Sequence, residues 1–317
     1  MALLNRRGRI AEVNALTMSL NDPPSLPSLA ANLAAPHFQT LRHNQAVHGP
    51  SSDLDHNPRY LVLRNFASRF LPDERDILVY LPEAYLTEPT RSFPVFYLHD
   101  GQNLFDPRTS YVPGRTWRAN TTADALAEAH RVEPVILVGI ENTGLRRMAE
   151  YTPTRDPRRG GGEGYKYGKL IVEELIPLIN STFRTLTGPA NTALGGSSLG
   201  GLISRALGLE YPQVFGKLAV MSPSVWWDNR SILNILGHGL RGHAGPRPNL
   251  RIWLDMGTAE GLRHLRDADL LHRRLTVRGW RDGKDLCYLR VPGGLHDESA
   301  WADRFDETLQ FLFPAHT

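Results

Sequence analysis

The stretch that most constrains this chain is residues 192–212, TALGGSSLGGLISRALGLEYP. A short apolar run ends in glycines and serines, and the apolar residues that follow recur at spacings of three and four, which is typical of a helix. Residues 196–200 fit the strand–turn–helix pattern of a nucleophile elbow, with Ser198 at its tip. A serine on such a sharp turn needs neighbours without bulk, and Gly196 and Gly200 supply them. The alternative interpretation is a Gly/Ser-rich turn before a surface helix.

Short apolar segments predict the strands of one sheet, and amphipathic stretches between them predict helices. Segments 93–98 and 134–140 are apolar throughout, as expected of strands buried on both faces. The pattern predicts an α/β fold with a mostly parallel, twisted sheet of about eight strands and helices on both faces. The other expected strands are 59–66, 76–82, the run before Ser198, 216–222, 250–255 and 285–291, and the expected helices include 122–130, 165–183, 261–278 and 299–313.

Three segments depart from this alternation. Residues 1–55 are rich in Pro, Ser, Asn and His with little periodicity, so we expect a loosely ordered N-terminal arm before a catalytic domain at 56–317. Residues 143–164 are expected to form a long loop at the rim of the site. Within the helix at 165–183, Pro177 is expected to cause a kink.

Composition limits the function classes. The net charge is only +3 and the arginines are scattered, which argues against a nucleic-acid partner. Cys287 is the only cysteine, so neither a disulfide within the chain nor a cysteine metal site is expected. There is no run of 18 apolar residues and no proper secretion signal at the start, so we expect a cytoplasmic protein that does not span a membrane. We expect no metal or cofactor, and the sequence leaves the oligomeric state open.

A nucleophilic serine needs a base, and the base needs an orienting acid. His296, in the segment PGGLHDESAW between the last strand and the last helix, stands where a sheet-top histidine is expected. The acid should follow the strand at 250–255, where Glu260 in the loop MGTAEG is the candidate and Asp255 lies nearer the strand itself. Asp267 and Asp269 are assigned to the polar face of the next helix.

An oxyanion hole needs two backbone N–H groups, one from the residue after the nucleophile and one from the loop after an earlier strand. Leu199 is the first, and Gln102 in the loop HDGQNLFD is the favoured second. His99 and Asp100 resemble a second catalytic pair, but we expect them to shape that loop.

Three further residues are candidates for a substrate pocket. Trp226 and Trp227 follow the strand after the elbow helix, and they either line an acyl or aryl pocket or pack in the core. Arg147 is the third candidate, although a salt bridge that orders its loop is the favoured interpretation.

Eight stretches of the chain together resemble a known esterase family. It includes enterochelin (siderophore) esterases, the feruloyl and acetylxylan esterases of carbohydrate esterase family 1, and many predicted α/β-superfamily hydrolases. The stretches run from about residue 60 to 312: RDILVYLPEAY, FPVFYLHDGQNLFD, VGIENTGLRRMAEYTP, YGKLIVEELIPLINSTFRT, GGSSLGGL, MSPSVWWDN, GTAEG and PGGLHDESAW.

This resemblance implies an α/β-hydrolase fold, with Ser198 as nucleophile, His296 as base and Glu260 as acid. Feruloyl-esterase relatives more often carry Asp where this chain has Glu260, and some siderophore-esterase relatives work with a Ser–His pair alone. A dyad is therefore the alternative to a triad.

The expected activity is that of a serine carboxylesterase that acts on small-molecule esters through an acyl-enzyme. The substrate candidates are feruloyl or acetyl-sugar esters, siderophore-type esters and short-chain esters. The alternatives are an acyltransferase or serine peptidase on the same triad, or a hydrolase-fold binding protein without catalysis.

Overall fold

Nine strands form the main sheet of the computed structural model, which describes residues 38–40, 52–235 and 247–315. Their order is β1-β2-β3-β5-β4-β8-β9-β10-β11. Neighbours from β5 to β11 in this order are parallel, whereas the β1–β2, β2–β3 and β3–β5 pairs are antiparallel. The mostly parallel sheet is confirmed. The bounds are β1 Gln39–Thr40, β2 Tyr60–Phe66, β3 Arg75–Tyr80, β4 Val95–His99, β5 Ile136–Ile140, β8 Thr192–Ser197, β9 Lys217–Met221, β10 Arg251–Gly257 and β11 Leu286–Val291.

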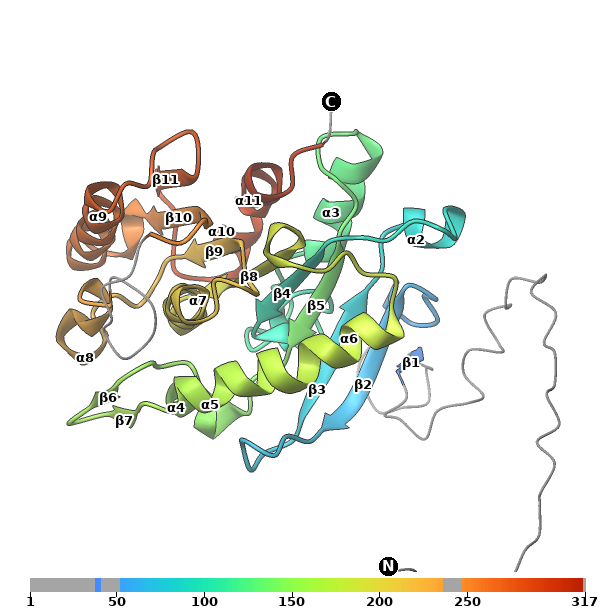
Figure 1. Cartoon of the computed structure of the whole chain (residues 1–317), viewed down its shortest axis with the longest axis horizontal. Coiled ribbons are helices and arrows are strands. Elements are labelled where there is room, and N and C mark those ends of the chain that lie inside the picture. The colour runs from blue at the N-terminus through green and yellow to red at the C-terminus, as the bar shows by residue number, and fades with distance from the viewer. Residues whose placement is uncertain (1–37, 41–51, 236–246, 316–317) are drawn as a thin grey trace, which may run out of the picture. The chain divides into compact units, whose positions relative to one another are not determined.

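The two faces of the sheet carry separate apolar cores, because successive side chains of a strand point to opposite sides. In β3, Ile77 and Val79 join one core, while Leu78 and Tyr80 join the other. Helices α5, α6, α7 and α9 contribute to the first core, and α3 and α11 contribute to the second (Figure 1). None of the helices in the described ranges has the length and apolar character that crossing a membrane requires. Their bounds are α2 Ala84–Thr87, α3 Ala119–Glu128, α4 Arg147–Glu150, α5 Gly164–Lys169, α6 Ile176–Thr182, α7 Leu199–Glu210, α8 Trp227–Arg230, α9 Leu262–Val277, α10 Glu298–Ala302 and α11 Phe305–Leu312.

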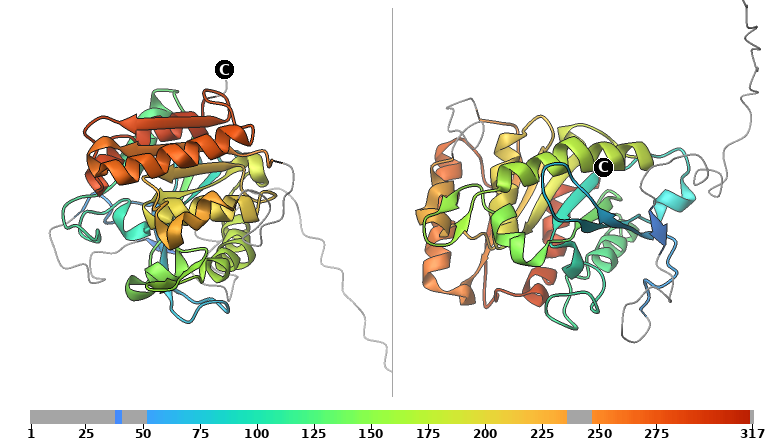
Figure 2. Two further views of the ribbon diagram at one scale, coloured as in Figure 1. Left: turned by 90° about the vertical axis from the view of Figure 1, so that its left-hand side faces the viewer. Right: turned by 90° about the horizontal axis from the view of Figure 1, so that it is seen from below.

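The parallel half of the sheet determines where a site can form. The N-terminal strands, in blue, lie at one edge of the sheet and the C-terminal strands, in orange, lie at the other (Figure 1, Figure 2). Because β4, β5, β8, β9, β10 and β11 are parallel, the loops after them leave from the same side of the sheet. Every residue predicted for the site lies in one of these loops or in the helix turn that follows.

The helix expected at 165–183 is continuous but not uniform. Between α5 and α6 the chain forms a wider, π-helical segment, Leu170–Leu175, and Pro177 stands at the beginning of α6. Proline has no N–H for the bond that an α-helix would need there, and a wider turn accommodates that loss. The disturbance expected at Pro177 therefore lies mostly in the turn before it.

Two other segments differ from expectation. The helix expected at 299–313 is split into α10 and α11, because the backbone leaves the helical region at Arg304, with φ −124° and ψ 5°. The Arg304 side chain turns into the buried interior instead. The loop expected at 143–164 contains α4 and a small hairpin of β6, Arg155–Asp156, and β7, Gly160–Gly161.

Most of the arm expected at 1–55 lies outside the described residues. Within it, β1 pairs with β2, and the buried Leu54 belongs to the second core. Asp55 forms a salt bridge of 2.7 Å with Arg108. The described residues from Phe38 onward belong to one compact unit.

Replacing Gly201 by alanine should destabilise the fold. A Cβ there would lie 2.8 Å from the backbone oxygen of Met221, so β9 or α7 must move. Overpacking of this kind costs about 1–3 kcal/mol, which exceeds the helix propensity that alanine gains. Urea unfolding should show a lower free energy of unfolding for Gly201→Ala. Gly200→Ala is the control, because its Cβ would meet the His99 side chain at 3.3 Å; equal losses for both variants would contradict the prediction.

Candidate active site

Ser198 occupies the sharp turn between β8 and α7. Its backbone has φ 59° and ψ −119°, a conformation that strains any residue with a side chain. The turn requires small neighbours: a Cβ on Gly196 would lie 3.0 Å from the Cβ of His99, and one on Gly201 would meet Met221. The structure thus places the predicted nucleophile at the tip of an elbow, with its side chain half-buried.

His296 lies between Ser198 and Glu260 and contacts both. Its Nε2 is 3.0 Å from the Ser198 Oγ, and its Nδ1 is 2.6 Å from Oε2 of Glu260. A carboxylate can only accept, so Nδ1 carries the proton and Nε2 is free to accept the serine hydroxyl proton. The His296 side chain is 45% exposed, whereas that of Glu260 is 2% exposed. The imidazole is therefore exposed at the surface, while the carboxylate that it contacts is buried.

The loops that carry the acid and the base pack directly against each other. A Cβ on Gly257 would lie 2.2 Å from the carbonyl oxygen of Gly294, so the two backbones touch. The Ala259 N–H donates to that same oxygen at 3.1 Å, and the Gly293 N–H donates to Thr258 Oγ1 at 2.9 Å. These contacts fix the distance between Glu260 and the loop that bears the histidine.

Glu260 is held by several donors. Its Oε1 accepts hydrogen bonds from the Gly257 N–H at 2.8 Å and from the Ser222 hydroxyl at 2.5 Å. Burial raises the pKa of Glu260, but the hydrogen bonds from His296, Ser222 and Gly257 outweigh it and hold that pKa below its usual range. The acid is therefore ionised at neutral pH.

Asp255, the alternative candidate for the acid, pairs with other groups. It is fully buried and accepts hydrogen bonds from the Trp253 indole at 2.7 Å and the Ser222 N–H at 3.1 Å. Burial raises its pKa, and the guanidinium of Arg304, 3.0 Å away, opposes that rise. Asp255 thus anchors Arg304, whose Nη2 also donates to the Ser222 Oγ at 2.6 Å.

The two acidic residues of α9, Asp267 and Asp269, make different contacts. Asp267 was expected on the polar face, but it is buried and forms a salt bridge of 2.6 Å with Arg230. The expectation was wrong because helical periodicity does not reveal a cation that another element supplies. Asp269 accepts a hydrogen bond from the Tyr288 hydroxyl at 2.7 Å, at the edge strand β11.

Leu199 and Gln102 both stand at the beginning of helical turns. Leu199 is the first residue of α7, and Gln102 lies within the short 3₁₀ turn Gly101–Asn103 after β4. The first N–H groups of a helix have no partner inside it, so the N–H groups of Leu199 and Gln102 are candidates for binding an anion. A Cβ on Gly101 would lie 2.8 Å from the backbone of Gly139, so this turn is pressed against β5.

Arg147 holds that turn in place. Its Nε and Nη2 each lie 2.7 Å from an oxygen of Asp100, whose backbone is left-handed at φ 57°. Asn142 donates to the same carboxylate at 2.7 Å. Burial raises the pKa of Asp100, but Arg147 and Asn142 lower it below the usual range. The salt bridge expected to order a loop is present, with Asp100 as the partner of Arg147.

His99 lies beneath the elbow rather than in the site. It is fully buried, and its Nδ1 is 2.9 Å from the Tyr167 hydroxyl. Burial lowers the pKa of His99 to about 3, so the ring is neutral at ordinary pH. It packs against Gly196 and Gly200, which agrees with the expected role of His99 and Asp100 in shaping the loop.

The paired tryptophans have different environments. Trp227 is fully buried, donates its indole N–H to the Thr154 carbonyl at 2.9 Å and contacts Gly161, so it packs in the core of the described structure. Trp226 is half-buried and lines a pocket that Arg159 also lines. The sequence pairs them, but only the fold decides which one faces the surface.

Ser222, Ser224 and Arg304 belong to the site but were not predicted for it. The Ser224 Oγ lies 3.3 Å from the Ser198 Oγ, and its N–H donates to the Ser198 carbonyl at 3.0 Å. The turn Ser-Pro-Ser directly after β9 is a usable signal for the two serines. Arg304 has no local signal, because its partners come from β10 and the loops beside it.

Comparisons with known proteins identify the family of this chain. A family described as putative esterase matches residues 68–312. The protein YbbA of Bacillus subtilis (strain 168) is 28% identical over 252 residues, which cover 75% of this chain and 92% of YbbA. Iron(III) salmochelin esterase of Escherichia coli O6:H1 is 27% identical over 243 residues, which cover 72% of this chain and 51% of that protein.

A solved structure shows the same fold. The BES protein from Bacillus cereus superposes with a TM-score of 0.65 at 21% identity, covering 84% of this chain and 98% of that one. The family match spans most of the chain, so the resemblance expected from the sequence is confirmed. With an α/β-hydrolase-like fold and esterases among its relatives, the chain belongs to the putative esterase family of carboxylic ester hydrolases.

Proposed function

We propose that this protein is a serine carboxylesterase that hydrolyses small-molecule esters through an acyl-enzyme intermediate. One observation carries the proposal: His296 bridges the Ser198 Oγ at 3.0 Å and the Glu260 Oε2 at 2.6 Å. This arrangement of a nucleophile, a base and an orienting acid is typical of enzymes that transfer acyl groups.

In the first half of the reaction, the Ser198 Oγ attacks the ester carbonyl carbon while Nε2 of His296 takes the hydroxyl proton. The negative charge then develops on the former carbonyl oxygen, and the N–H groups of Leu199 and Gln102 stabilise it. When the tetrahedral intermediate collapses, the C–O bond to the alcohol breaks and the imidazolium returns its proton to the leaving oxygen. The product alcohol departs and Ser198 remains acylated.

In the second half, water replaces the alcohol. Nε2 of His296 takes a proton from the water, whose oxygen attacks the acyl carbon. Collapse of this second intermediate breaks the bond to the Ser198 Oγ, which recovers its proton from the imidazolium. The carboxylic acid product leaves and the free enzyme is restored. The scheme uses no metal and no cofactor.

Glu260 acts through His296. Its ionised carboxylate fixes the proton on Nδ1 and stabilises the positive charge that the ring carries in each transition state. Support comes from its lowered pKa and from the donors Ser222 and Gly257, which keep it charged and oriented.

The substrate class follows from the relatives. The similar salmochelin esterase and the family resemblance favour a small ester of siderophore, feruloyl, acetyl-sugar or short-chain type. A panel containing one ester of each type, with kcat/KM measured for each, distinguishes these candidates.

Ser198→Ala should remove esterase activity and leave the fold intact. Without the hydroxyl no acyl-enzyme forms, so we expect kcat on 4-nitrophenyl acetate to fall by at least about 10⁴-fold. Ser197→Ala is the matched control, because Ser197 is adjacent but buried at the end of β8. A fluorophosphonate probe should label wild type and Ser197→Ala only. Loss of turnover in Ser197→Ala but not in Ser198→Ala would overturn the assignment.

Glu260→Gln should lower kcat by about 10²–10³-fold with little change in KM, because an amide neither fixes the tautomer nor stabilises the imidazolium. Circular dichroism checks that the variant folds. Asp269→Asn is the control, since Asp269 is an acidic residue of the neighbouring α9 that bonds Tyr288 instead. Wild-type rates for Glu260→Gln would mean that Ser198 and His296 work as a dyad.

A further inference from the structure

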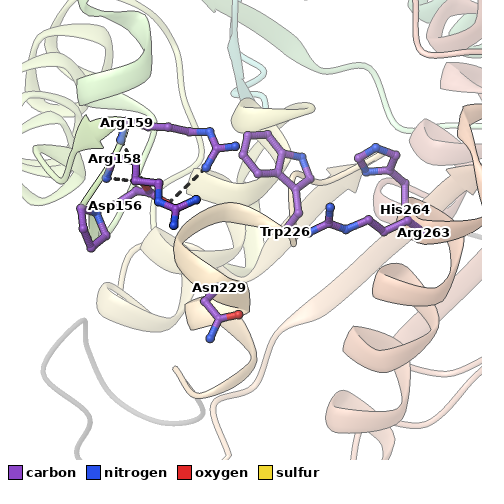
Figure 3. Close-up of a pocket in the computed structure, with 8 residues that line it drawn as sticks. Asp156, Arg158, Arg159, Trp226, Asn229, Arg263 and His264 are labelled. Carbon is purple, nitrogen blue, oxygen red and sulfur yellow. Dashed lines mark hydrogen bonds and ion pairs between the residues drawn. The ribbon is translucent and has the colours of Figure 1, made fainter.

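A pocket of about 640 Å³ lies between the β6–β7 hairpin, α8 and the beginning of α9 (Figure 3). Its volume is in the range of small-molecule sites. Arg158 and Arg159 enter it from the hairpin, Trp226 and Asn229 from the segment after β9, and Arg263 from α9. Elements far apart in the sequence therefore supply cations to one cavity.

The charge of this pocket is not balanced by its own residues. Asp156 is the one acidic side chain among its lining residues in the described structure, against three arginines. That carboxylate already accepts hydrogen bonds from the backbone N–H groups of Arg158 at 2.8 Å and Arg159 at 2.9 Å, and it forms an ion pair with the Arg159 guanidinium at 3.5 Å. No ion pair involves Arg158 or Arg263 within the ranges that the structure describes. The pocket therefore has an excess of positive charge.

The position of Arg263 increases this excess. It is the second residue of α9, a helix of 16 residues whose first turn has no acidic residue. The N-terminus of a helix already carries partial positive charge and free N–H groups, so an arginine there adds to the positive charge and favours a bound anion. The helix end and the guanidinium groups thus favour the same kind of ligand.

Two residues that line the pocket are close in sequence to residues of the candidate site. Trp226 is two residues after Ser224, whose Oγ is 3.3 Å from the Ser198 Oγ, and two residues span at most about 7 Å. Arg263 is three residues after Glu260. The Arg159 guanidinium lies 5.3 Å from the centroid of the Trp226 ring, so one wall of the pocket is an aromatic ring that orients a cation.

We propose that this pocket binds an anionic group of the ester substrate, a carboxylate or a similar oxyanion, and so makes the enzyme selective for anionic esters. The proposal rests on the esterase function proposed above and specifies the substrate of the same site. Arg159 and Arg263 determine this specificity by pairing with the anion, and Trp226 fixes the position of Arg159.

Matched substrates test the proposal. For a charge on the alcohol side, 4-acetoxybenzoate is compared with phenyl acetate. For a charge on the acyl side, methyl 3-(4-carboxyphenyl)propanoate is compared with methyl 3-phenylpropanoate. Wild type should show at least about tenfold higher kcat/KM for the anionic member of one pair, the scale of a hydrogen bond to a charged group. Arg159→Gln and Arg263→Gln should remove that preference, so that the ratio of kcat/KM between the anionic and the neutral member falls to about one.

Arg155→Gln is the control variant, because Arg155 is an exposed arginine of the same hairpin that does not line the pocket. It should keep the wild-type preference. A preference for the neutral ester in both pairs, or a preference that survives both pocket variants, would overturn the proposal.

Calorimetric binding separates this proposal from the esterase assignment. 3-Phenylpropanoate should bind wild type at least about tenfold more tightly than 3-phenylpropanamide, and the two pocket variants should lose the difference. Absence of turnover for every ester, with this binding difference intact, would refute the esterase function and retain the anion site. Equal binding of acid and amide would refute the anion site even if neutral esters are hydrolysed.

Discussion

The strained backbone of Ser198 is the constraint on which the site depends. A non-glycine residue in such a conformation costs about 1–3 kcal/mol, so the surroundings must hold it. The Ser198 N–H donates to the Met221 carbonyl at 3.0 Å, and the Leu202 N–H donates to the Ser198 carbonyl at 3.1 Å. The neighbouring strand and the new helix thus fix the turn from both sides. The glycines around it are needed because those elements approach so closely.

Glu260 and His296 lie in the loops after two other strands, β10 and β11. Arg304 connects the residues around Glu260. Its guanidinium contacts Asp255 at the end of β10 and the Ser222 hydroxyl after β9. The Ser222 hydroxyl in turn donates to Glu260. Arg304, which supplies this buried cation, stands at the break between α10 and α11. The helix is thus broken at a residue whose side chain belongs to the charge network around Glu260.

Those parts of the fold and of the candidate site that have a local physical cause could be predicted from the sequence. Continuous apolar runs predict strands buried on both faces, and the order Ser198, Glu260, His296 follows from one serine-bearing elbow and two loops after strands. The features that could not be predicted depend on tertiary packing. Trp227 is buried and Trp226 lines a pocket, although they are neighbours in sequence. The burial of Asp267 against Arg230 is set by packing between helices, which periodicity does not encode.

The buried imidazole under the nucleophile has a consequence for acid tolerance. In the folded protein the pKa of His99 is about 3, and its Nε2 has no partner among the described residues, whereas an imidazole in an unfolded chain titrates near ~6.5. Between these values only the unfolded chain takes up the proton, so stability falls as the pH drops through this window. Mild acid would thus destabilise the buried floor of the elbow itself, so this protein should unfold more readily as the medium becomes acidic.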